Sequence, residues 1–308
     1  MATEYIDTYY KRTLGDAQTY YAPLAGAADA DICVVGGGLA GLSTALELAR
    51  RGRSVTLLEG RRIAWGASGR NGGSVSPAFS AGADAIRKHV DEDHYRQLYR
   101  LSMEGVEIIR DNIRALHITD AHKVDGRLRV VRYEATDALR RYCDDQWRDF
   151  GRDVRLLSRA DVRERLVSDA YFQGIEDLAS FHFHPLNYAR ALARECVRLG
   201  VTIHEDSPVT QARLDGPVKQ LQTAAGQVNA RTVVLATGGY TGDAVPALRR
   251  AMLPIATYIM LTEPLGDRVH EAIRTPAAIG DDRRAGNYYR VLAVSYTHLR
   301  AHETREDL

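Results

Sequence analysis

The sequence predicts an α/β protein with two interleaved domains, one built on a parallel sheet and the other on a mixed or antiparallel sheet. Three observations predict this class. A short apolar strand at 31–38 runs into glycines and a helix that ends at Gly52, and a second strand at 54–60 completes a β–α–β unit. Helical patterns then occupy most of residues 84–150, and short strand patterns return after residue 200. With 308 residues, 45% of them hydrophobic, the chain is long enough for a sizeable core.

The other elements follow in order along the chain. Residues 1–29 read as a polar arm that carries two tyrosine pairs. Ser158 has Asp161 three residues on, which is close to a capping box at the start of a helix. The further elements are a helical stretch at 84–118, a strand at 127–133, an amphipathic helix at 134–150, a helix at 187–200, successive short strands from 201 to 239, and strands at 253–264 and 287–294.

Composition and charge exclude several classes of protein. The 41 basic and 40 acidic side chains leave a net charge of +1 without blocks of one sign, which is unlike a nucleic-acid binder. No apolar run reaches the length of a membrane span, and the first residues lack the apolar core of a signal peptide. The three cysteines show neither a disulfide framework nor a zinc spacing. We therefore expect a cytoplasmic protein with no nucleic-acid partner, no integral membrane segment and no metal.

Gly36, Gly38 and Gly41 form a GxGxxG pattern between the first strand and the first helix. The first glycine permits the tight turn, the second lets backbone approach a pyrophosphate, and the third lets the helix pack closely on the sheet. The partial positive charge of the helix N-terminus suits the phosphates. Glu59 ends the second strand, where a carboxylate accepts hydrogen bonds from ribose hydroxyls and repels the 2′-phosphate of NADP. The alternative is a glycine-rich structural turn.

The segment Gly66–Gly73, "GASGRNGG", favours a flavin over a nicotinamide. A flat isoalloxazine ring needs close backbone approach and N–H donors, which glycines provide. Arg70 is a candidate to meet phosphate or ring charge, and Asn71 is a candidate to fix the loop. The alternative is a mobile surface loop. A second glycine-bearing strand end, "VVLATGGY" at 233–240, places further bare backbone where ligands bind in such folds.

Read together, these blocks resemble the D-amino-acid-oxidase-like flavoproteins. "DICVVGGGLAGLSTALELARRGRSVTLLEG" followed by "WGASGRNGG" carries the resemblance, and the second string is most similar to the γ-glutamylputrescine oxidoreductase branch. "RTVVLATGGYTG" and "DDRRAGNYYRV" match later blocks in order, so that the resemblance spans roughly residues 5–293.

The resemblance implies a Rossmann-type, glutathione-reductase-like FAD domain in 30–83 and 186–248. An α+β substrate domain would occupy 84–185 and 249–294. It implies non-covalent FAD, with the loop 68–73 against the flavin, the backbone near Val209 by the adenine and Thr237 near the dinucleotide. The implied cofactor-binding residues are Gly36, Gly38, Gly41, Glu59, Ser68, Arg70, Asn71, Gly72, Gly73, Val209, Thr237 and Gly238.

The chemistry that the resemblance implies is oxidation of a substrate C–N bond. Hydride equivalents pass to flavin N5, and the imine product is hydrolysed. The expected partners are a small-molecule amine, and oxygen or another electron acceptor. Tyr288 and Arg290 are the candidate catalytic residues, because a tyrosine can wall an amine pocket and an arginine can hold a carboxylate. The alternative for this pair is a core tyrosine beside a solvated arginine. The alternative functions are an NAD-linked dehydrogenase and a non-catalytic dinucleotide-binding fragment.

Two histidine pairs are weaker features. His182 and His184 could share one face of a strand, but no third ligand lies near them in sequence, so we expect no metal there. His298 and His302 lie in the segment 295–308, "SYTHLRAHETREDL", which breaks from the preceding pattern. We expect that segment to be a non-native tail. It would replace the strand and helix that close the flavin pocket in the resembled family, and a chain without them is expected to bind FAD weakly or to aggregate.

Overall fold

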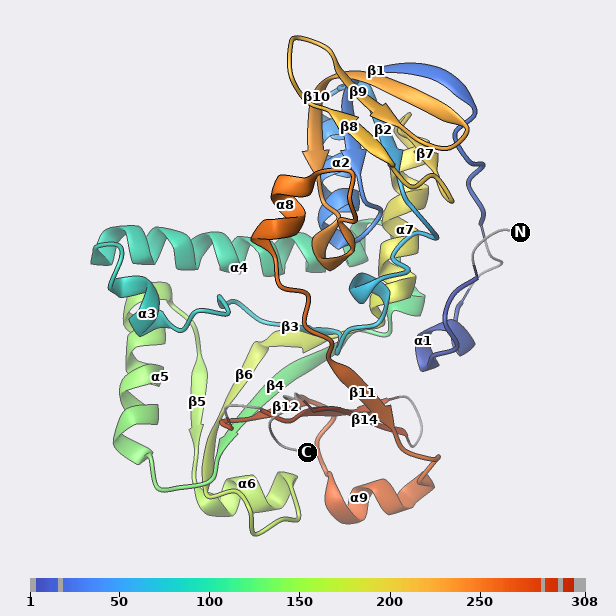
Figure 1. The fold of residues 1–308 in the computed structure, drawn as a ribbon. Helices are drawn as coiled ribbons and strands as arrows, with labels where there is room; N and C mark the ends of the chain where they lie inside the picture. The colour runs from blue at the N-terminus through green and yellow to red at the C-terminus, as the bar shows by residue number, and fades with distance from the viewer. Residues whose placement is uncertain (1–3, 16–18, 284–285, 293–295, 302–308) are drawn as a thin grey trace. The chain divides into compact units, whose positions relative to one another are not determined.

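The computed structural model describes residues 4–15, 19–283, 286–292 and 296–301, the last of these by their backbone. The chain forms two compact units (Figure 1). Unit 1 comprises Met1–Asn71 and His184–Ala256, and unit 2 comprises Gly72–Phe183 and Thr257–Leu308. The contacts thus place 72–83 in unit 2 and 249–256 in unit 1, whereas the sequence grouped each with the other domain. The predicted α/β class is confirmed.

Unit 1 contains a six-stranded sheet whose strands follow the order β7-β2-β1-β10-β9-β8. The first four strands run parallel, and β9 and β8 add an antiparallel edge. Two helices, α2 and α7, pack against each other beside the sheet (Figure 1). The bounds are β1 Gly26–Val35, α2 Leu39–Arg50, β2 Val55–Leu58, α7 Pro185–Arg198, β7 Thr202–His204, β8 Gln211–Arg213, β9 Lys219–Gln222, β10 Gly226–Leu235 and α8 Pro246–Ala251.

The N-terminal residues are part of this unit, which corrects the prediction of a polar arm over 1–29. Strand β1 already begins at Gly26, and α1 spans Tyr9–Arg12. The Tyr5 hydroxyl donates to the Ile63 carbonyl at 2.8 Å, and the Tyr10 hydroxyl donates to the Asn71 carbonyl at 2.7 Å. Both rings are buried. Their apolar bodies cover the loop after β2, and their hydroxyls satisfy its backbone carbonyls.

Unit 2 contains a mixed sheet in the order β11-β14-β13-β12-β4-β6-β3, with β5 paired to β6. Only the β12–β4 pair is parallel among the described pairs of this sheet. The bounds are β3 Ser74–Val75, α3 Ala83–Arg87, α4 Glu92–Ala115, β4 Val124–Val131, α5 Thr136–Phe150, β5 Val154–Leu157, α6 Arg159–Arg165, β6 Gln173–His182, β11 Tyr258–Leu261, α9 Val269–Ala272, β12 Ala278–Asp281, β13 Tyr288–Leu292 and β14 Tyr296–Ala301.

Three details of unit 2 bear on the sequence predictions. The helical pattern at 84–118 is two helices, because the Asp91 carboxylate accepts from the His94 N–H and starts α4 anew. The capping box of Ser158 and Asp161 is present at the start of α6. Part of the segment expected to be a foreign tail forms β14, which pairs with β13 and β11. His302 lies outside the described residues.

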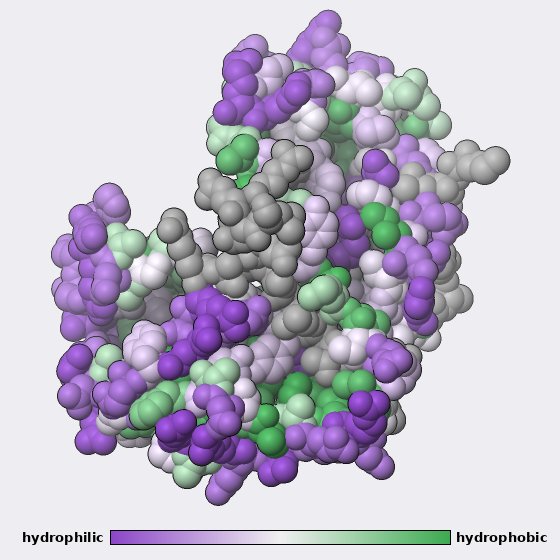
Figure 2. All heavy atoms as spheres, turned by 60° about the horizontal axis from the view of Figure 1, so that its bottom comes forward, coloured by the Kyte–Doolittle hydropathy of each residue, from purple (hydrophilic) through white to green (hydrophobic). Residues whose placement is uncertain are grey.

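The two faces of the unit 2 sheet differ in character. Leu128, Val130 and Ile279 point to one face, where they form a core with Val162 of α6, and Tyr289 packs against it. Because side chains alternate along a strand, Arg127, Arg129, Gly280, Tyr288 and Arg290 belong to the opposite face. We call this the arginine face. Figure 2 brings the α6 and α9 end of unit 2 forward and shows a mostly hydrophilic surface with small hydrophobic patches.

No helix among the described residues is long and apolar enough to cross a membrane.

Candidate functional site

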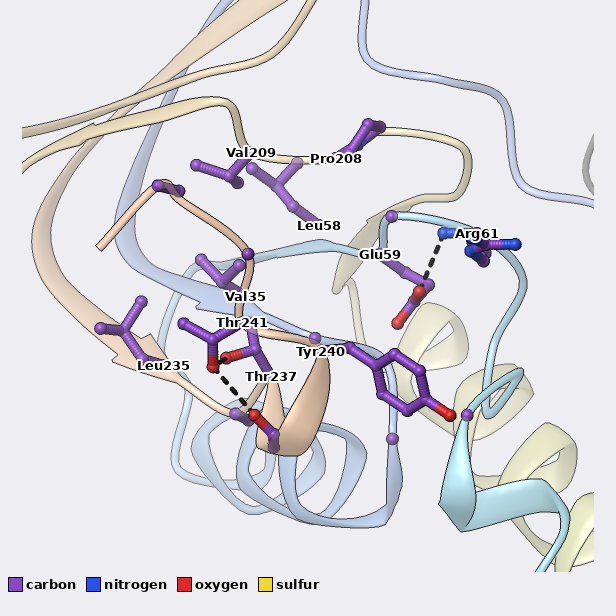
Figure 3. A pocket seen from close by; sticks show the side chains of 18 of the residues that line it. Val35, Leu58, Glu59, Arg61, Pro208, Val209, Leu235, Thr237, Tyr240 and Thr241 are labelled. Atoms are coloured by element: carbon purple, nitrogen blue, oxygen red, sulfur yellow. Dashed lines mark hydrogen bonds between the residues drawn. The ribbon is translucent and has the colours of Figure 1, made fainter. Parts of the chain in front are cut away.

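A pocket of about 380 Å³ opens in unit 1 at the carboxyl ends of β1, β2 and β10, beside the N-terminus of α2 (Figure 3). Ligands of open α/β sheets bind at this edge. The apolar side chains of Val35, Leu58 and Val209 line the pocket together with the polar groups of Glu59 and Thr237. In Figure 3 the Glu59 carboxylate and the Tyr240 ring lie at the same side of the pocket, away from Val209. A pocket of this size is in the range that holds small ligands.

The three glycines of the GxGxxG pattern have the backbone roles that the sequence predicted for the turn and the helix. Gly36 adopts φ +110°, and a Cβ there would stand 2.5 Å from the Ala236 carbonyl oxygen. At Gly41 a Cβ would overlap the Gly36 carbonyl oxygen, so α2 packs against the turn at a distance that only glycine allows. Gly38 is the N-cap of α2, and its bare backbone lines the pocket.

Ser68 connects the glycine-rich segment 66–73 to this helix N-terminus. Its hydroxyl accepts from the Leu39 N–H at 3.0 Å, and a Cβ on Gly38 would stand 2.8 Å from its Oγ. A hydroxyl that accepts from one amide of a helix N-terminus leaves the dipole in place and keeps its own O–H to donate. Ser68 therefore places a neutral donor beside the amides expected to meet a pyrophosphate.

The Glu59 carboxylate stands at the end of β2, as the sequence predicted, and already holds two backbone amides. Its Oε2 accepts from the Gly37 N–H at 2.6 Å and its Oε1 accepts from the Arg61 N–H at 2.9 Å. Burial raises the pKa of Glu59, and the hydrogen bonds from these amides oppose that rise. A carboxylate has about four lone-pair sites, so the same group has acceptor capacity for ribose hydroxyls.

The loop 66–73 is held by its own side chains. The Asn71 amide donates to the Ala67 carbonyl at 3.1 Å and to the Ser68 carbonyl at 2.9 Å, which is the loop-fixing role suggested by the sequence. Arg70 donates to the Trp65 carbonyl at 3.0 Å and to the Tyr240 hydroxyl at 3.1 Å. Its guanidinium thus ties the loop to the segment after β10 at one side of the pocket.

The segment before β8 and the segment after β10 complete the pocket. Val209 lines it next to Pro208. Thr237 and Thr241 join their hydroxyls at 2.7 Å (Figure 3), and Gly238 adopts φ +52° at the start of a short 3-10 turn. The sequence reasoning did not single out Trp65 or Tyr240, which meet edge to face with ring centroids 6.0 Å apart. Trp65 and Tyr240 stand inside the glycine-rich strings "WGASGRNGG" and "VVLATGGY", and this position is the sequence signal that could have identified them.

A buried ion pair that the sequence did not reveal fixes the loop behind Glu59. The Arg62 Nε lies 3.1 Å from the Glu205 Oε2, and both side chains are at most 5% exposed. Glu205 also accepts from the Ile63 N–H at 2.6 Å and the Tyr21 N–H at 3.1 Å. The pair therefore joins the loop after β2, the N-terminal segment and the strand end at β7.

The rest of the glycine-rich segment lies in unit 2, where Gly73 sits beside Arg290. Gly73 adopts φ +68°, and a Cβ there would stand 2.7 Å from an Arg290 guanidinium nitrogen. A Cβ at Gly72, by contrast, would meet open space. Gly73 therefore leaves the room that the Arg290 guanidinium occupies.

Arg290 is buried, with 4% of its surface exposed, and its guanidinium lies 2.6 Å from His182 Nδ1. Arginine can only donate, so His182 Nδ1 accepts and its Nε2–H donates to the Pro276 carbonyl at 2.8 Å. Burial and the Arg290 charge lower the pKa of His182 to about 4. His182 is thus a neutral acceptor that orients the guanidinium. His184 caps α7 in unit 1, so the two histidines belong to different units.

Tyr288 and Arg290 lie two residues apart on β13 and share the arginine face. The Tyr288 ring covers Gly280 of the neighbouring strand, because a Cβ on Gly280 would stand 3.2 Å from the ring. The alternative of a solvated arginine is wrong, since Arg290 is buried and Tyr288 is 38% exposed. The pair presents one exposed phenol and one buried cation on the same surface.

Comparison with known proteins places the chain in a family. The family model described as FAD dependent oxidoreductase (DAO) matches residues 31–301. The probable oxidoreductase OrdL of Haemophilus influenzae is 34% identical over 94% of this chain and 68% of its own length. The γ-glutamylputrescine oxidoreductase of Escherichia coli is 36% identical over the same shares.

Solved structures support the fold. Glycine oxidase from Geobacillus kaustophilus aligns with a TM-score of 0.68 at 21% identity, covering 90% of this chain and 72% of that one. L-Proline dehydrogenase from P. horikoshii aligns with a TM-score of 0.69 at 18% identity, covering 92% and 72%. The glycine cradle, the helix N-terminus and the strand-end carboxylate fit the dinucleotide that such a family requires. The chain belongs to the FAD dependent oxidoreductase (DAO) family, and its cofactor is FAD.

Proposed function

We propose that this chain oxidises a C–N bond of an amine or amino acid, with a γ-glutamylputrescine-like compound as its substrate. The observation that carries the proposal is the strand–glycine–helix pocket with Glu59 at its edge, in a chain that is 36% identical to a γ-glutamylputrescine oxidoreductase. FAD, when bound, supplies an acceptor at flavin N5 for the hydride equivalents of the carbon that bears the amine. The resulting imine is hydrolysed to a carbonyl compound and ammonia or an amine.

The residues of unit 1 have separate tasks in holding the cofactor. Gly36, Gly38 and the N-terminus of α2 face the pyrophosphate, with Ser68 as a neighbouring donor. Glu59 accepts from ribose hydroxyls, and the backbone at Val209 lies by the adenine. These assignments account for why bare backbone, a helix end and a carboxylate meet in one pocket.

The second group of cofactor contacts comes from the loop 66–73 and the segment after β10. Arg70 contributes a fixed positive charge, and Asn71 keeps the loop in its conformation through two carbonyls. By the resemblance to the family, Gly72 and Gly73 would offer backbone to the flavin ring. Thr237 and Gly238 line the pocket and would offer polar backbone to the dinucleotide. Backbone amides held next to the ring would stabilise negative charge on it.

Tyr288 and Arg290 bind and orient the substrate on the arginine face. Arg290 holds a carboxylate by paired N–H donors, and its neutral neighbour His182 fixes the plane of the guanidinium without neutralising its charge. Tyr288 forms a wall for the amine end, which must be neutral when it reacts. The chain needs no nucleophile for this chemistry, because orientation and charge are what the protein contributes.

Two further assignments belong to the same proposal. The electron acceptor is oxygen or another acceptor such as a quinone. The enzyme works in the reducing cytoplasm, where its three free cysteines stay reduced. The NAD-linked alternative is set aside by the family to which the chain belongs. A non-catalytic dinucleotide-binding fragment remains the rival function.

A panel of amines tests the proposal. The FAD-loaded protein is mixed with γ-glutamylputrescine, putrescine, glycine and proline, and product aldehyde or keto acid and ammonia are measured. We expect γ-glutamylputrescine to give the highest kcat/KM. Arg290→Lys should lower kcat/KM for substrates that carry a carboxylate more than for putrescine. FAD binding without turnover of any amine would favour the non-catalytic fragment instead.

A further inference from the structure

The N-terminal segment, which we define as residues 4–15 and 19–24, runs along the outside of unit 1 to the start of β1 (Figure 1). Many of its contacts fall on residues 61–71, which we call the cofactor loop. Residues of this loop form one wall of the dinucleotide pocket: Arg61, Ala64, Trp65, Gly66, Ala67 and Ser68. No described residue of the N-terminal segment lines the pocket. The segment therefore contacts the loop from outside the pocket.

The first residues of the segment hold the first half of the cofactor loop. The Trp65 Nε1–H donates to the Glu4 carbonyl at 2.9 Å, and the Tyr5 hydroxyl donates to the Ile63 carbonyl at 2.8 Å. Tyr5 and Ile63 are both buried. Because Trp65 itself lines the pocket, these bonds fix the loop directly beside the cofactor site.

Tyr10 connects the segment to the helix end that is proposed to meet the pyrophosphate. Its hydroxyl donates to the Asn71 carbonyl at 2.7 Å, and the Asn71 amide donates to the Ser68 carbonyl at 2.9 Å. The Ser68 hydroxyl in turn accepts from the Leu39 N–H at 3.0 Å, in the first turn of α2. One series of contacts thus runs from Tyr10 through the cofactor loop to the N-terminus of α2.

The base of this series is fixed on the start of α7. The Thr13 hydroxyl donates to the Tyr9 carbonyl at 2.7 Å, so its oxygen accepts from the His184 Nε2–H at 3.1 Å. His184 Nδ1 accepts from the Asn187 N–H at 3.1 Å, which agrees with the same neutral tautomer. The Tyr10 and His184 rings meet edge to face with centroids 4.9 Å apart. Since a helix as short as α1 is unstable alone, these contacts keep Tyr10 in place.

The N-terminal segment contributes few side chains to the core. Among its described residues, only Tyr5, Tyr10 and Leu24 are buried. A segment with few buried apolar contacts opens locally at a small cost in free energy, while the rest of the domain stays folded. Opening of this segment should therefore act mainly on the cofactor loop that it contacts.

We propose that the N-terminal segment is a clamp that holds the cofactor loop in the conformation that binds FAD, with Tyr5 and Tyr10 as its positioning residues. When the clamp opens, the apparent affinity for FAD falls with the fraction of molecules whose loop is competent to bind. By linkage, bound FAD stabilises the closed clamp by the same factor, although the segment does not line the pocket. The inference rests on the proposed FAD contacts of this pocket and is independent of the amine substrate.

Tyr10→Phe tests the clamp, because it removes one hydroxyl and keeps the buried ring. Fluorescence titration of the full chain with FAD should give a dissociation constant about three-fold to ten-fold higher than that of the wild type. Adding Tyr5→Phe should raise it further. Well below the melting temperature nearly all molecules are folded, so a purely structural role would lower the melting temperature and leave the dissociation constant unchanged.

Tyr20→Phe is the matched control, because it removes a hydroxyl of the same segment that bonds outside the cofactor loop. The Tyr20 hydroxyl donates to the Asp206 carboxylate at 3.2 Å. This variant should bind FAD as tightly as the wild type. An unchanged dissociation constant in Tyr10→Phe, or equal weakening in Tyr10→Phe and Tyr20→Phe, would overturn the inference.

Limited trypsin digestion gives a second readout that needs no substrate. Lys11 and Arg12 lie in α1, so cleavage after them reports opening of the clamp. Saturating FAD should slow this cleavage in the wild type by about five-fold or more, and by less in Tyr10→Phe. Cleavage at the same rate with and without FAD would overturn the clamp.

The same measurements separate the clamp from the proposed function. FAD binding that depends on Tyr10, without oxidation of any amine, would support the clamp and count against the proposed function alone. Failure of the wild type to bind FAD would overturn the assignment of the pocket and the clamp together. Wild-type FAD binding that Tyr10→Phe leaves unchanged would overturn the clamp alone.

Discussion

Replacement of Gly41 by alanine sets two opposing effects against each other in α2. Alanine is the best helix former and glycine is among the worst, so propensity alone predicts a gain of about 1 kcal/mol in the free energy of unfolding. Against this, the added Cβ would overlap the Gly36 carbonyl oxygen at less than 3.0 Å and stand 3.3 Å from a Val34 methyl carbon. The Gly36 oxygen belongs to backbone and cannot rotate away.

The clash decides the sign. Forcing a methyl group into a packed site costs about 1–3 kcal/mol, and here the backbone turn that faces the pocket must shift. We expect Gly41→Ala to lower the free energy of unfolding by up to about 2 kcal/mol after the propensity gain is subtracted. Because the shift moves the N-terminus of α2 away from the pyrophosphate, FAD should also bind more weakly.

Gly105 offers the matched control. It lies inside α4, and a Cβ there would meet nothing within 4 Å. Gly105→Ala should therefore raise the free energy of unfolding by about 1 kcal/mol and leave FAD binding unchanged. Urea unfolding followed by circular dichroism measures both variants. If Gly41→Ala were as stabilising as Gly105→Ala, the close packing of α2 on the Gly36 turn would be refuted.

Three other changes follow from the contacts of the two units. Glu59→Gln should weaken FAD binding about ten-fold to hundred-fold, because it loses charged hydrogen bonds to the ribose. Flavin fluorescence titration measures this affinity, and an unchanged value would contradict the role of Glu59. Arg62→Ala should cost about 3–5 kcal/mol in urea unfolding because it leaves the buried Glu205 charge uncompensated, and a cost below about 1 kcal/mol would argue against the pair. Burial and the Arg290 charge lower the pKa of His182 from 6.5 to about 4. Its contribution to the free energy of unfolding is therefore complete above pH 6.5, and about 3 kcal/mol is lost as the pH falls toward 4. His182→Gln keeps an acceptor for Arg290 and should flatten this part of the pH–stability curve; curves of equal slope for both proteins would contradict the buried neutral histidine.

Local chemistry made the dinucleotide pocket predictable. A GxGxxG between a strand and a helix, with a carboxylate after the next strand, leaves few folds open, and the structure places Gly36, Gly38 and Glu59 around one pocket. The capping box at Ser158 is a signal of the same local kind. Such features are readable because each depends on residues that are neighbours in sequence.

The features that could not be predicted from the sequence depend on residues far apart in the chain. His182 and Arg290 are 108 positions apart, and only the sheet brings them together. The Tyr5 and Tyr10 hydroxyls donate to carbonyls about 60 residues away, and no periodicity in the sequence predicts these contacts. These contacts follow from topology, which a local pattern does not encode.

The most direct test is a visible absorbance scan of the purified protein with FAD, recorded without oxygen before and after addition of γ-glutamylputrescine. We predict flavin bands that stay with the protein on gel filtration and bleach when the amine is added. Bands that persist unchanged with γ-glutamylputrescine and with every other amine would contradict amine oxidation. Absence of bound flavin at saturating FAD would contradict the assignment of the pocket at Gly36, Gly38 and Glu59 to FAD.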